Sequence, residues 1–321
     1  MTPTPKSWKP FGEQLEILME RGLQVDDCEA AKSYLQRIGY YRLSGYWYPF
    51  RQLERQQGDG GKISDRRSNV FVAGSHFREV VQLYVFDKKL RLLALDALER
   101  IEMALRVDIA HLLGKQDIHA HENPNCFHGH FSKQIQRKGY AKGKTWHQVW
   151  LERYQQNLHR ARREPFVEHY LKKYGQLPIW VAVEVWDFGM MSKLYAGMKP
   201  ADKGRIAAKY GATDGGTLAE WVRSLNFIRN VSAHHSRLWN INVLERSAPL
   251  VDDSYWQTLS NARPFFYFCL IQKLLRNICP NSTWAQRFQA LVQEFPATVS
   301  GTVSLQDMGM PESWETWELW R

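Results

Sequence analysis

Apolar residues recur at helical spacing through residues 75–113, the longest regular pattern in the chain. Residues three and four apart share one face of an α-helix, whereas strand side chains alternate between two faces. The pattern therefore predicts a helix of about ten turns, from Ser75 or His76 to Leu113. Its apolar positions are Val80, Leu83, Phe86, Leu90, Leu93, Leu95, Leu98, Ile101, Leu105, Ile109 and Leu112. We expect this helix to be the scaffold on which the others pack.

Shorter amphipathic patterns predict further helices on both sides of the long one. Asp26 or Asp27 is a typical N-cap for one of them, and Asp252 or Asp253 for the helix that ends at Cys279. The expected ranges are 13–22, 28–38, 146–174, 178–195, 200–210, 253–279 and 282–295. The sequence contains no internal repeat and no β-rich region, so the predicted fold class is all-α.

Changes in composition divide the chain into four parts. They are a small helical N-terminal domain (1–51), a polar, glycine-rich linker or flexible loop (52–74), a main helical domain (75–296) with a basic insertion at about 115–145, and an acidic tail (297–321). The tail carries Trp314, Trp317 and Trp320 three residues apart. Such a stripe would dock either on this chain or on a partner.

The stretch 224–242, SLNFIRNVSAHHSRLWNIN, predicts a helix with two different faces. The packing face would consist of Trp221, Leu225, Ile228 and Trp239. The other face would carry cations, amides and a histidine, namely Arg223, Asn226, Asn230, His234 and Arg237, with Arg229 at its edge. No acidic residue lies between Trp221 and Leu244, although exposed helices often mix Glu with Lys. A solvated basic face is the alternative, but a surface of donors and an imidazole suits a phosphate.

Three of these side chains suggest a catalytic site. Arg229 would hold a phosphate through its planar donor fork, or stabilise the extra charge of the transition state. His234 would move the proton, because an unperturbed imidazole titrates near neutrality. Asn230, one turn before His234, could orient the imidazole or the RNA. His235 is expected either to be packed or to support the catalytic residues, and Arg237 is expected to support them. With a ribose 2′-OH as nucleophile, this set could cleave RNA without a metal or another cofactor.

The net charge of +10 is concentrated in one window. Nine basic residues and one acidic residue lie between Ser132 and Arg163. Such a block favours a polyanionic partner, and it has no sizeable apolar face for insertion into a membrane. The residues expected to bind RNA in it are Lys133, Arg137, Lys138, Lys142 and Lys144.

Two other groups of residues allow a functional and a structural interpretation. Tyr40, Tyr41 and Arg42 could stack on unpaired bases, or the aromatic residues around them could form the core of the N-terminal domain. Glu102 lies on the long helix, where it could orient the catalytic pair or form an ordinary ion pair between successive turns.

The segment QDIHAHENPNCFHGHF, residues 116–131, contains four histidines and Cys126. Its spacing matches no common zinc pattern, so a polar loop near the RNA is preferred to a metal site. The four cysteines of the chain are scattered, and no run of 18 apolar residues and no apolar signal-peptide core occurs. These features favour a reducing, cytoplasmic location and no membrane span.

Three sequence blocks carry a resemblance to a known family. They are IGYYRLSGYWYPF (38–50), LYVFDKKLRLLALDALERIEMALR (83–106) and the motif RN-x3-HH-x-R-x-W-N, which begins at Arg229. Together they resemble the Abi-like abortive-infection proteins of bacterial phage defence, of the AbiF/AbiD type, within the HEPN superfamily. The superfamily motif is Arg, a polar residue and then His. The bare pattern of Arg followed by His is also matched by Arg106–His111, Arg153–His159, Arg162–His169 and Arg163–His169, of which Arg106 and His111 could form a second active pair.

The resemblance implies a HEPN-like helical bundle and a metal-independent endoribonuclease toxin. It also implies a homodimer in which two Arg229–His234 pairs share one cleft, and a non-coding RNA that restrains the activity. Two alternatives remain open from the residues. One is a non-catalytic RNA-binding component of a ribonucleoprotein, and the other is a DNA-binding regulator, since the basic window would bind either polymer.

Overall fold

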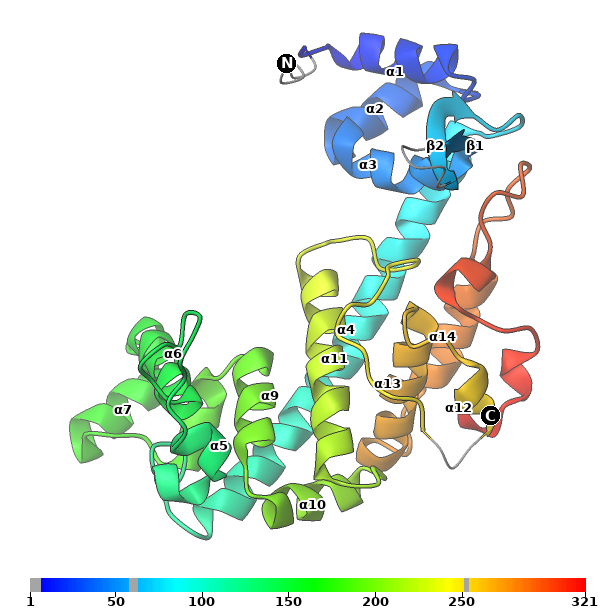
Figure 1. Cartoon of the computed structure of the whole chain (residues 1–321). Helices are drawn as coiled ribbons and strands as arrows, with labels where there is room; N and C mark the ends of the chain where they lie inside the picture. Colours follow the sequence, from blue (N-terminus) through cyan, green and yellow to red (C-terminus); the bar gives the residue numbers. More distant parts are fainter. Residues whose placement is uncertain (1–6, 58–62, 251–253) are drawn as a thin grey trace.

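The computed structural model describes residues 7–57, 63–250 and 254–321, and it is mostly helical, as predicted. Its scaffold is α4, Phe77–Gly114, which agrees with the expected 75–113 and is about 57 Å long at 1.5 Å per residue. A capping box formed by His76 and Glu79 starts the helix. Its buried face extends from Phe77 to Leu113. Helices from both ends of the chain therefore share one support (Figure 1).

The N-terminal helices lie at the start of α4 (Figure 1). They are α1, Phe11–Glu20, α2, Cys28–Ile38, and α3, Tyr40–Trp47. Asp27 caps α2 by accepting a hydrogen bond of 2.9 Å from the Ala30 N–H, as predicted. Trp47 is buried in this unit.

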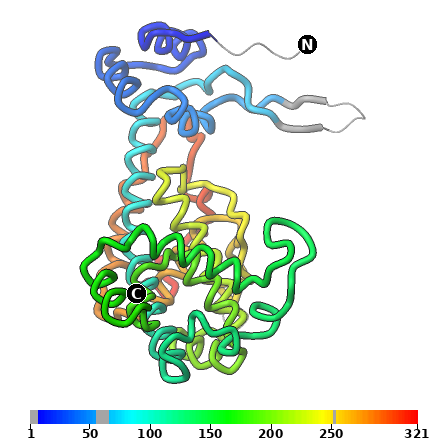
Figure 2. The backbone as a smooth tube through the Cα atoms, turned by 90° about the vertical axis from the view of Figure 1, so that its left-hand side faces the viewer, coloured from blue at the N-terminus to red at the C-terminus, as the bar shows by residue number. Residues whose placement is uncertain are grey.

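Residues 52–74 were expected to be a linker or flexible loop, and that expectation is wrong for most of the segment. β1, Arg51–Gln57, pairs antiparallel with β2, Ile63–Phe71, in a hairpin (Figure 2). The Arg67 guanidinium donates hydrogen bonds of 2.6 Å to the carbonyls of Pro49 and Arg51. The strands are mainly polar, so the alternation that marks a half-buried strand is missing from the sequence. The tip, 58–62, lies outside the described residues.

The helices of the main body pack along α4. They are α11, Gly215–Ala233, α13, Pro264–Ile278, and α14, Trp284–Gln293, with α9, Phe188–Gly197, and α10, Pro200–Lys209, beside α11 (Figure 1). Trp221, Leu225 and Ile228 of α11 are fully or almost fully buried. The predicted packing of this helix against the scaffold is therefore confirmed.

Three predicted helices are divided in the structure. Range 146–174 is divided into α6, Trp146–Ala161, and α7, Pro165–Tyr174. Range 178–195 is divided into α8, Ile179–Ala182, a 3-10 turn, Val183–Val185, and α9. Range 253–279 is divided into α12, Ser254–Thr258, and α13. Pro165 and Pro264 each occupy a first helical position, because proline has no N–H to donate to a preceding turn. The side chain of Asp187 caps α9 and so separates it from the preceding turn.

The tryptophan-rich tail docks on its own chain. Trp314, Trp317 and Trp320 are buried, and the Trp320 ring stacks on Phe288 of α14 at a centroid distance of 4.7 Å. Gln289 donates a hydrogen bond of 2.8 Å to the Trp320 carbonyl. Of the two alternatives for this stripe, the structure supports docking on the same chain.

Gly197 ends α9 where α5, Gly129–Ser132, crosses it, and a side chain there has no room. A Cβ at this position would lie 2.5 Å from two ring carbons of Phe131. We expect Gly197→Ala to lower the free energy of unfolding by about 1–3 kcal/mol through overpacking, measured by urea denaturation. Gly204→Ala in α10 is the control, because no heavy atom lies within 4 Å of its added Cβ. A Gly197 variant as stable as the parent would contradict this packing.

Candidate active site

Helix α11 ends earlier than the sequence predicts. Its last residue is Ala233, and His235 has a φ of 58°, in the left-handed region. The His235 N–H donates to the Ser232 carbonyl and the Ser236 N–H to the Val231 carbonyl, at 3.2 and 2.9 Å. These two bonds form a Schellman motif, which satisfies the last carbonyls of a helix and stops it. His234 is consequently the residue that caps the helix.

Residues after His235 therefore leave the predicted helical face. Arg237 turns toward the N-terminal helices and donates a hydrogen bond to the Gly45 carbonyl. Burial lowers the pKa of Arg237, although the nearby oxygens of Tyr46 and Asp87 act in the opposite direction. Arg237 thus connects the site loop to the N-terminal unit and does not line the site pocket.

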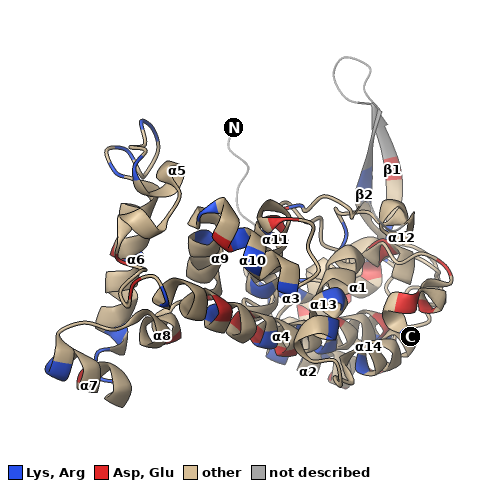
Figure 3. Ribbon diagram, turned by 90° about the horizontal axis from the view of Figure 1, so that it is seen from below, with Lys and Arg blue, Asp and Glu red and all other residues tan. Residues whose placement is uncertain are grey.

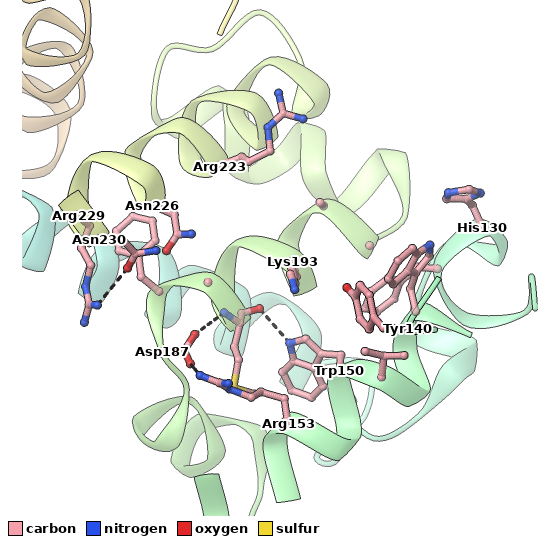
Figure 4. Close-up of a pocket in the computed structure, with 18 of the residues that line it drawn as sticks. His130, Tyr140, Trp150, Arg153, Asp187, Lys193, Arg223, Asn226, Arg229 and Asn230 are labelled. Carbon is pink, nitrogen blue, oxygen red and sulfur yellow. Dashed lines mark hydrogen bonds and ion pairs between the residues drawn. The ribbon is translucent and has the colours of Figure 1, made fainter. Parts of the chain in front are cut away.

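A pocket of about 1200 Å³ lies between α11, α9 and the α5–α6 segment (Figure 4). The three predicted catalytic residues, Arg229, Asn230 and His234, all line it. Its other polar walls are formed by His128, His130, Arg153, Asp187, Lys193, Arg223 and Asn226, and its aromatic walls by Phe131, Tyr140, Trp146, Trp150 and Phe188. The helix face that the sequence singled out therefore borders a cavity that a ligand can enter.

Arg229 is half-buried, and its guanidinium donates a hydrogen bond of 3.3 Å to the Asn230 side-chain carbonyl. Among the residues that the structure describes, no carboxylate forms an ion pair with it. Glu102 on α4 pairs instead with Arg106, at 2.5 Å. Burial raises the pKa of Glu102, while the positive charges of Arg106 and Arg229 act to lower it. Glu102 thus interacts with Arg229 electrostatically but forms no ion pair with it, so the Arg229 guanidinium stays available to bind an anion.

The His234 side chain is exposed at the end of α11. Its backbone N–H donates to the Asn230 carbonyl at 2.9 Å, which fixes the position of the residue. Within the described ranges, no group forms a hydrogen bond with its ring. The ring is therefore free to accept a proton from a ligand or to donate one.

The opposite wall of the pocket contains three charged residues that the sequence did not mark as catalytic. Arg153 of α6 pairs with Asp187 at 2.9 Å, and the Met190 N–H donates to the same carboxylate at 2.8 Å. Burial alone would raise the pKa of Asp187, but these bonds outweigh it and the pKa is lowered. Lys193 of α9 is exposed on the pocket wall. An N-cap pattern before FGMM was the only local signal for Asp187.

The loop after His234 is held by the N-terminal unit. Arg42 of α3 donates a hydrogen bond of 2.5 Å to the His235 carbonyl. The His235 side chain is exposed, which contradicts the packed alternative for this residue, and its supporting role stays a prediction. Farther along, the carboxylate of Asp87 on α4 accepts hydrogen bonds from the N–H groups of Leu238 and Trp239 at 3.0 and 2.7 Å.

The aromatic block of the N-terminal unit divides between core and surface. Tyr40 packs edge-on against Trp47 at a centroid distance of 4.8 Å, and Tyr46 is buried. Tyr41 is 91% exposed. None of Tyr40, Tyr41 and Arg42 lines the pocket. Their role in RNA binding stays a prediction.

The last part of the basic insertion, residues 133–145, forms the loop between α5 and α6, where cations gather (Figure 3). Lys133, Arg137, Lys138 and Lys142 are exposed, and Lys144 pairs with Glu152 at 2.5 Å. This loop also carries Tyr140 at the edge of the pocket. None of these five cations lines the pocket, but through Tyr140 their loop borders the cavity that the predicted catalytic residues also line.

The histidines of residues 119–130 have separate environments. His121 is buried against Tyr154 at a centroid distance of 5.0 Å, whereas His128 and His130 line the pocket. In the described part of the chain, no group of three or more His, Cys, Asp or Glu side chains is placed to hold a metal ion. His111 of the second sequence match is exposed and does not line the pocket.

Fold and site together define a mostly helical protein with a basic, partly aromatic pocket beside the C-terminal half of α11. The sequence model of the Abi-like proteins matches residues 33–240, from α2 to the loop after α11. The chain therefore belongs to the Abi-like protein family. No curated protein and no solved structure matches it significantly. None of the described helices has both the length and the apolar character needed to cross a membrane.

Proposed function

We propose that this protein is a metal-independent endoribonuclease of the abortive-infection response, with Arg229 and His234 as its catalytic pair. The observation that supports the proposal most directly is the composition of the pocket wall. A guanidinium without a carboxylate partner, an amide and an accessible imidazole line the same cavity, within the described residues. This set matches the requirements of phosphoryl transfer from a ribose 2′-OH.

In the proposed reaction, His234 accepts the proton of a ribose 2′-OH, and the 2′-oxygen attacks the adjacent phosphorus. Arg229 binds the non-bridging phosphoryl oxygens, whose charge increases in the transition state. The bond from phosphorus to the 5′-oxygen breaks, and the leaving oxygen takes a proton from water or from the histidine of a second copy. The products are a 2′,3′-cyclic phosphate and a 5′-hydroxyl end.

Two parts of the proposal rest on the family resemblance. One is a homodimer, in which the second copy would bring its own Arg229–His234 pair to the same cleft. The other is a non-coding RNA that binds the protein and restrains cleavage. Light scattering of the purified protein tests the homodimer. Sequencing of any RNA that remains bound to the protein tests the non-coding RNA.

The test of the reaction is RNA cleavage in excess EDTA. We expect the purified full-length chain to cut single-stranded RNA there and to leave 2′,3′-cyclic phosphate ends, identified by mass spectrometry. RNA with a 2′-deoxyribose at the cleaved position should stay intact, because it lacks the nucleophile. Cleavage that requires an added divalent cation, or that leaves 3′-hydroxyl ends, would contradict the proposal.

A non-catalytic component of a ribonucleoprotein is the second candidate. The observation in its favour is that the ring of His234 forms no hydrogen bond that would orient it, within the described ranges. In that case Arg229 and His234 would only bind phosphate, and alanine at either position would weaken RNA binding without any cleavage in the parent protein.

A further inference from the structure

Two aromatic side chains of the pocket have no part in the proposed reaction. Tyr140 and Trp146 both line the cavity, with ring centroids 5.6 Å apart and planes at 62°. Figure 4 shows Tyr140 on the opposite side of the pocket from Arg229, with Lys193 between them in this view. Tyr140 is 74% exposed. Much of a large aromatic ring is thus presented to solvent at the edge of a cavity.

The loop that carries Tyr140 is held in place by its backbone. The Gln136 N–H donates to the Lys144 carbonyl and the Gly143 N–H donates to the Gln136 carbonyl, both at 2.9 Å. Gly139 and Gly143 supply the positive φ angles of 73° and 81° that close the loop. Tyr140 therefore lies on a closed loop, which lowers the entropy lost when a ligand contacts its ring.

The loop that carries Tyr140 also carries several cations. Arg137, Lys138 and Lys142 are exposed on the same loop, and they form no ion pair with any described residue. Lys144 is neutralised by Glu152, and Lys193 continues the positive charge into the pocket. Aromatic rings between cations are the usual means by which proteins bind unpaired nucleotides, since the rings stack on bases while the cations bind phosphates.

We propose that Tyr140 and Trp146 form a stacking site for an unpaired base of an RNA strand that passes Lys193 and reaches Arg229. The inference rests on the proposed function for the identity of the polymer, and it adds that the site requires a base with a free face. In a duplex each base is stacked between neighbours and paired, so its faces are not available to the tyrosine ring. The pocket would therefore select single-stranded segments.

The test measures binding in a His234→Ala background, so that cleavage does not disturb the equilibrium. The probes are a short single-stranded RNA, the same strand with abasic positions, and its duplex, followed by fluorescence anisotropy. Adding Tyr140→Ala should weaken binding of the single strand by roughly 5-fold to 150-fold, the range for loss of one stacked base. Binding of the duplex and of the abasic strand should change little.

Two matched variants separate stacking from other effects. Tyr140→Phe keeps the ring and should bind like the His234→Ala parent. Tyr174→Ala removes an exposed tyrosine from α7, where it does not line the pocket, and should also leave binding unchanged. Because no charge is removed, the slope of affinity against salt should stay the same in the Tyr140→Ala variant.

The stacking site is overturned if Tyr140→Ala binds the single strand as tightly as the His234→Ala parent does. It is also overturned if affinities for single strand and duplex fall by the same factor, or if the parent binds abasic RNA as well as intact RNA. These outcomes are independent of catalysis. A chain that never cleaves RNA but shows the expected binding pattern would contradict the nuclease and leave the stacking site standing.

Discussion

Replacing His234 with alanine should lower the rate of RNA cleavage by roughly 10²-fold to 10⁴-fold, the contribution typical of a general acid or base. The effect should fall on the chemical step, because an exposed ring without a hydrogen-bond partner among the described residues contributes little to folding. The measurement is single-turnover cleavage of RNA by a saturating excess of protein in EDTA. Saturation separates the loss of catalysis from any loss of affinity.

Arg229→Ala should slow the same step by roughly 10²-fold to 10³-fold, as expected for loss of one donor to the transition-state charge. Arg229→Lys should recover only part of this rate, because an ammonium lacks the planar donor fork. The matched controls are His111→Ala on α4 and Arg205→Ala on α10, an exposed histidine and an exposed arginine that do not line the pocket. Both should cleave at the parental rate.

If the His234 and Arg229 variants both cut RNA like the parent, the pocket wall on α11 is not the active site. If the controls lose activity to the same degree, the losses reflect folding or dimerisation and not chemistry. Circular dichroism of all five variants at the assay temperature shows whether a loss of activity accompanies a loss of helical structure.

The helices that pack against one another could be predicted because burial imposes a period on the sequence. The buried face of α4 and the inner face of α11, with Trp221, Leu225 and Ile228, follow from that period alone. The outer face of α11 was indicated by the cations, amides and histidine of a stretch that has no acid between Trp221 and Leu244. The residue types alone were sufficient to predict these three pocket residues, since Arg229, Asn230 and the cap residue His234 all come from one helix.

The end of α11 could not be predicted in the same way. Helices commonly stop at a glycine in the left-handed region, but here His235 adopts that conformation. The backbone of this loop is held by contacts from distant parts of the chain, including Arg42 and Asp87. The opposite wall of the pocket could not be predicted for the same reason. Arg153, Asp187 and Lys193 are brought to α11 only by tertiary packing.

Replacing Asp87 with alanine should lower the free energy of unfolding by about 3–5 kcal/mol, the cost of breaking a buried ion pair by removing one partner. Asp87 is completely buried, and its carboxylate pairs with Arg91 on the same helix. It also accepts a hydrogen bond of 2.7 Å from the Tyr46 hydroxyl, besides those from Leu238 and Trp239. Alanine would leave the buried Arg91 cation without its carboxylate partner, and the N–H groups of Leu238 and Trp239 without their acceptor. Urea denaturation measures the loss.

Asp96→Ala is the matched control on the same helix. Its carboxylate is about one-third exposed and pairs with Arg100 and Arg287, so its loss should cost at most about 1 kcal/mol. Equal losses for the two variants would show that Asp87 contributes no more than a surface ion pair. A large loss for Asp87 alone would mean that one carboxylate joins α3, α4 and the loop after His234. In that case the N-terminal unit and the proposed catalytic histidine would be coupled through the protein core.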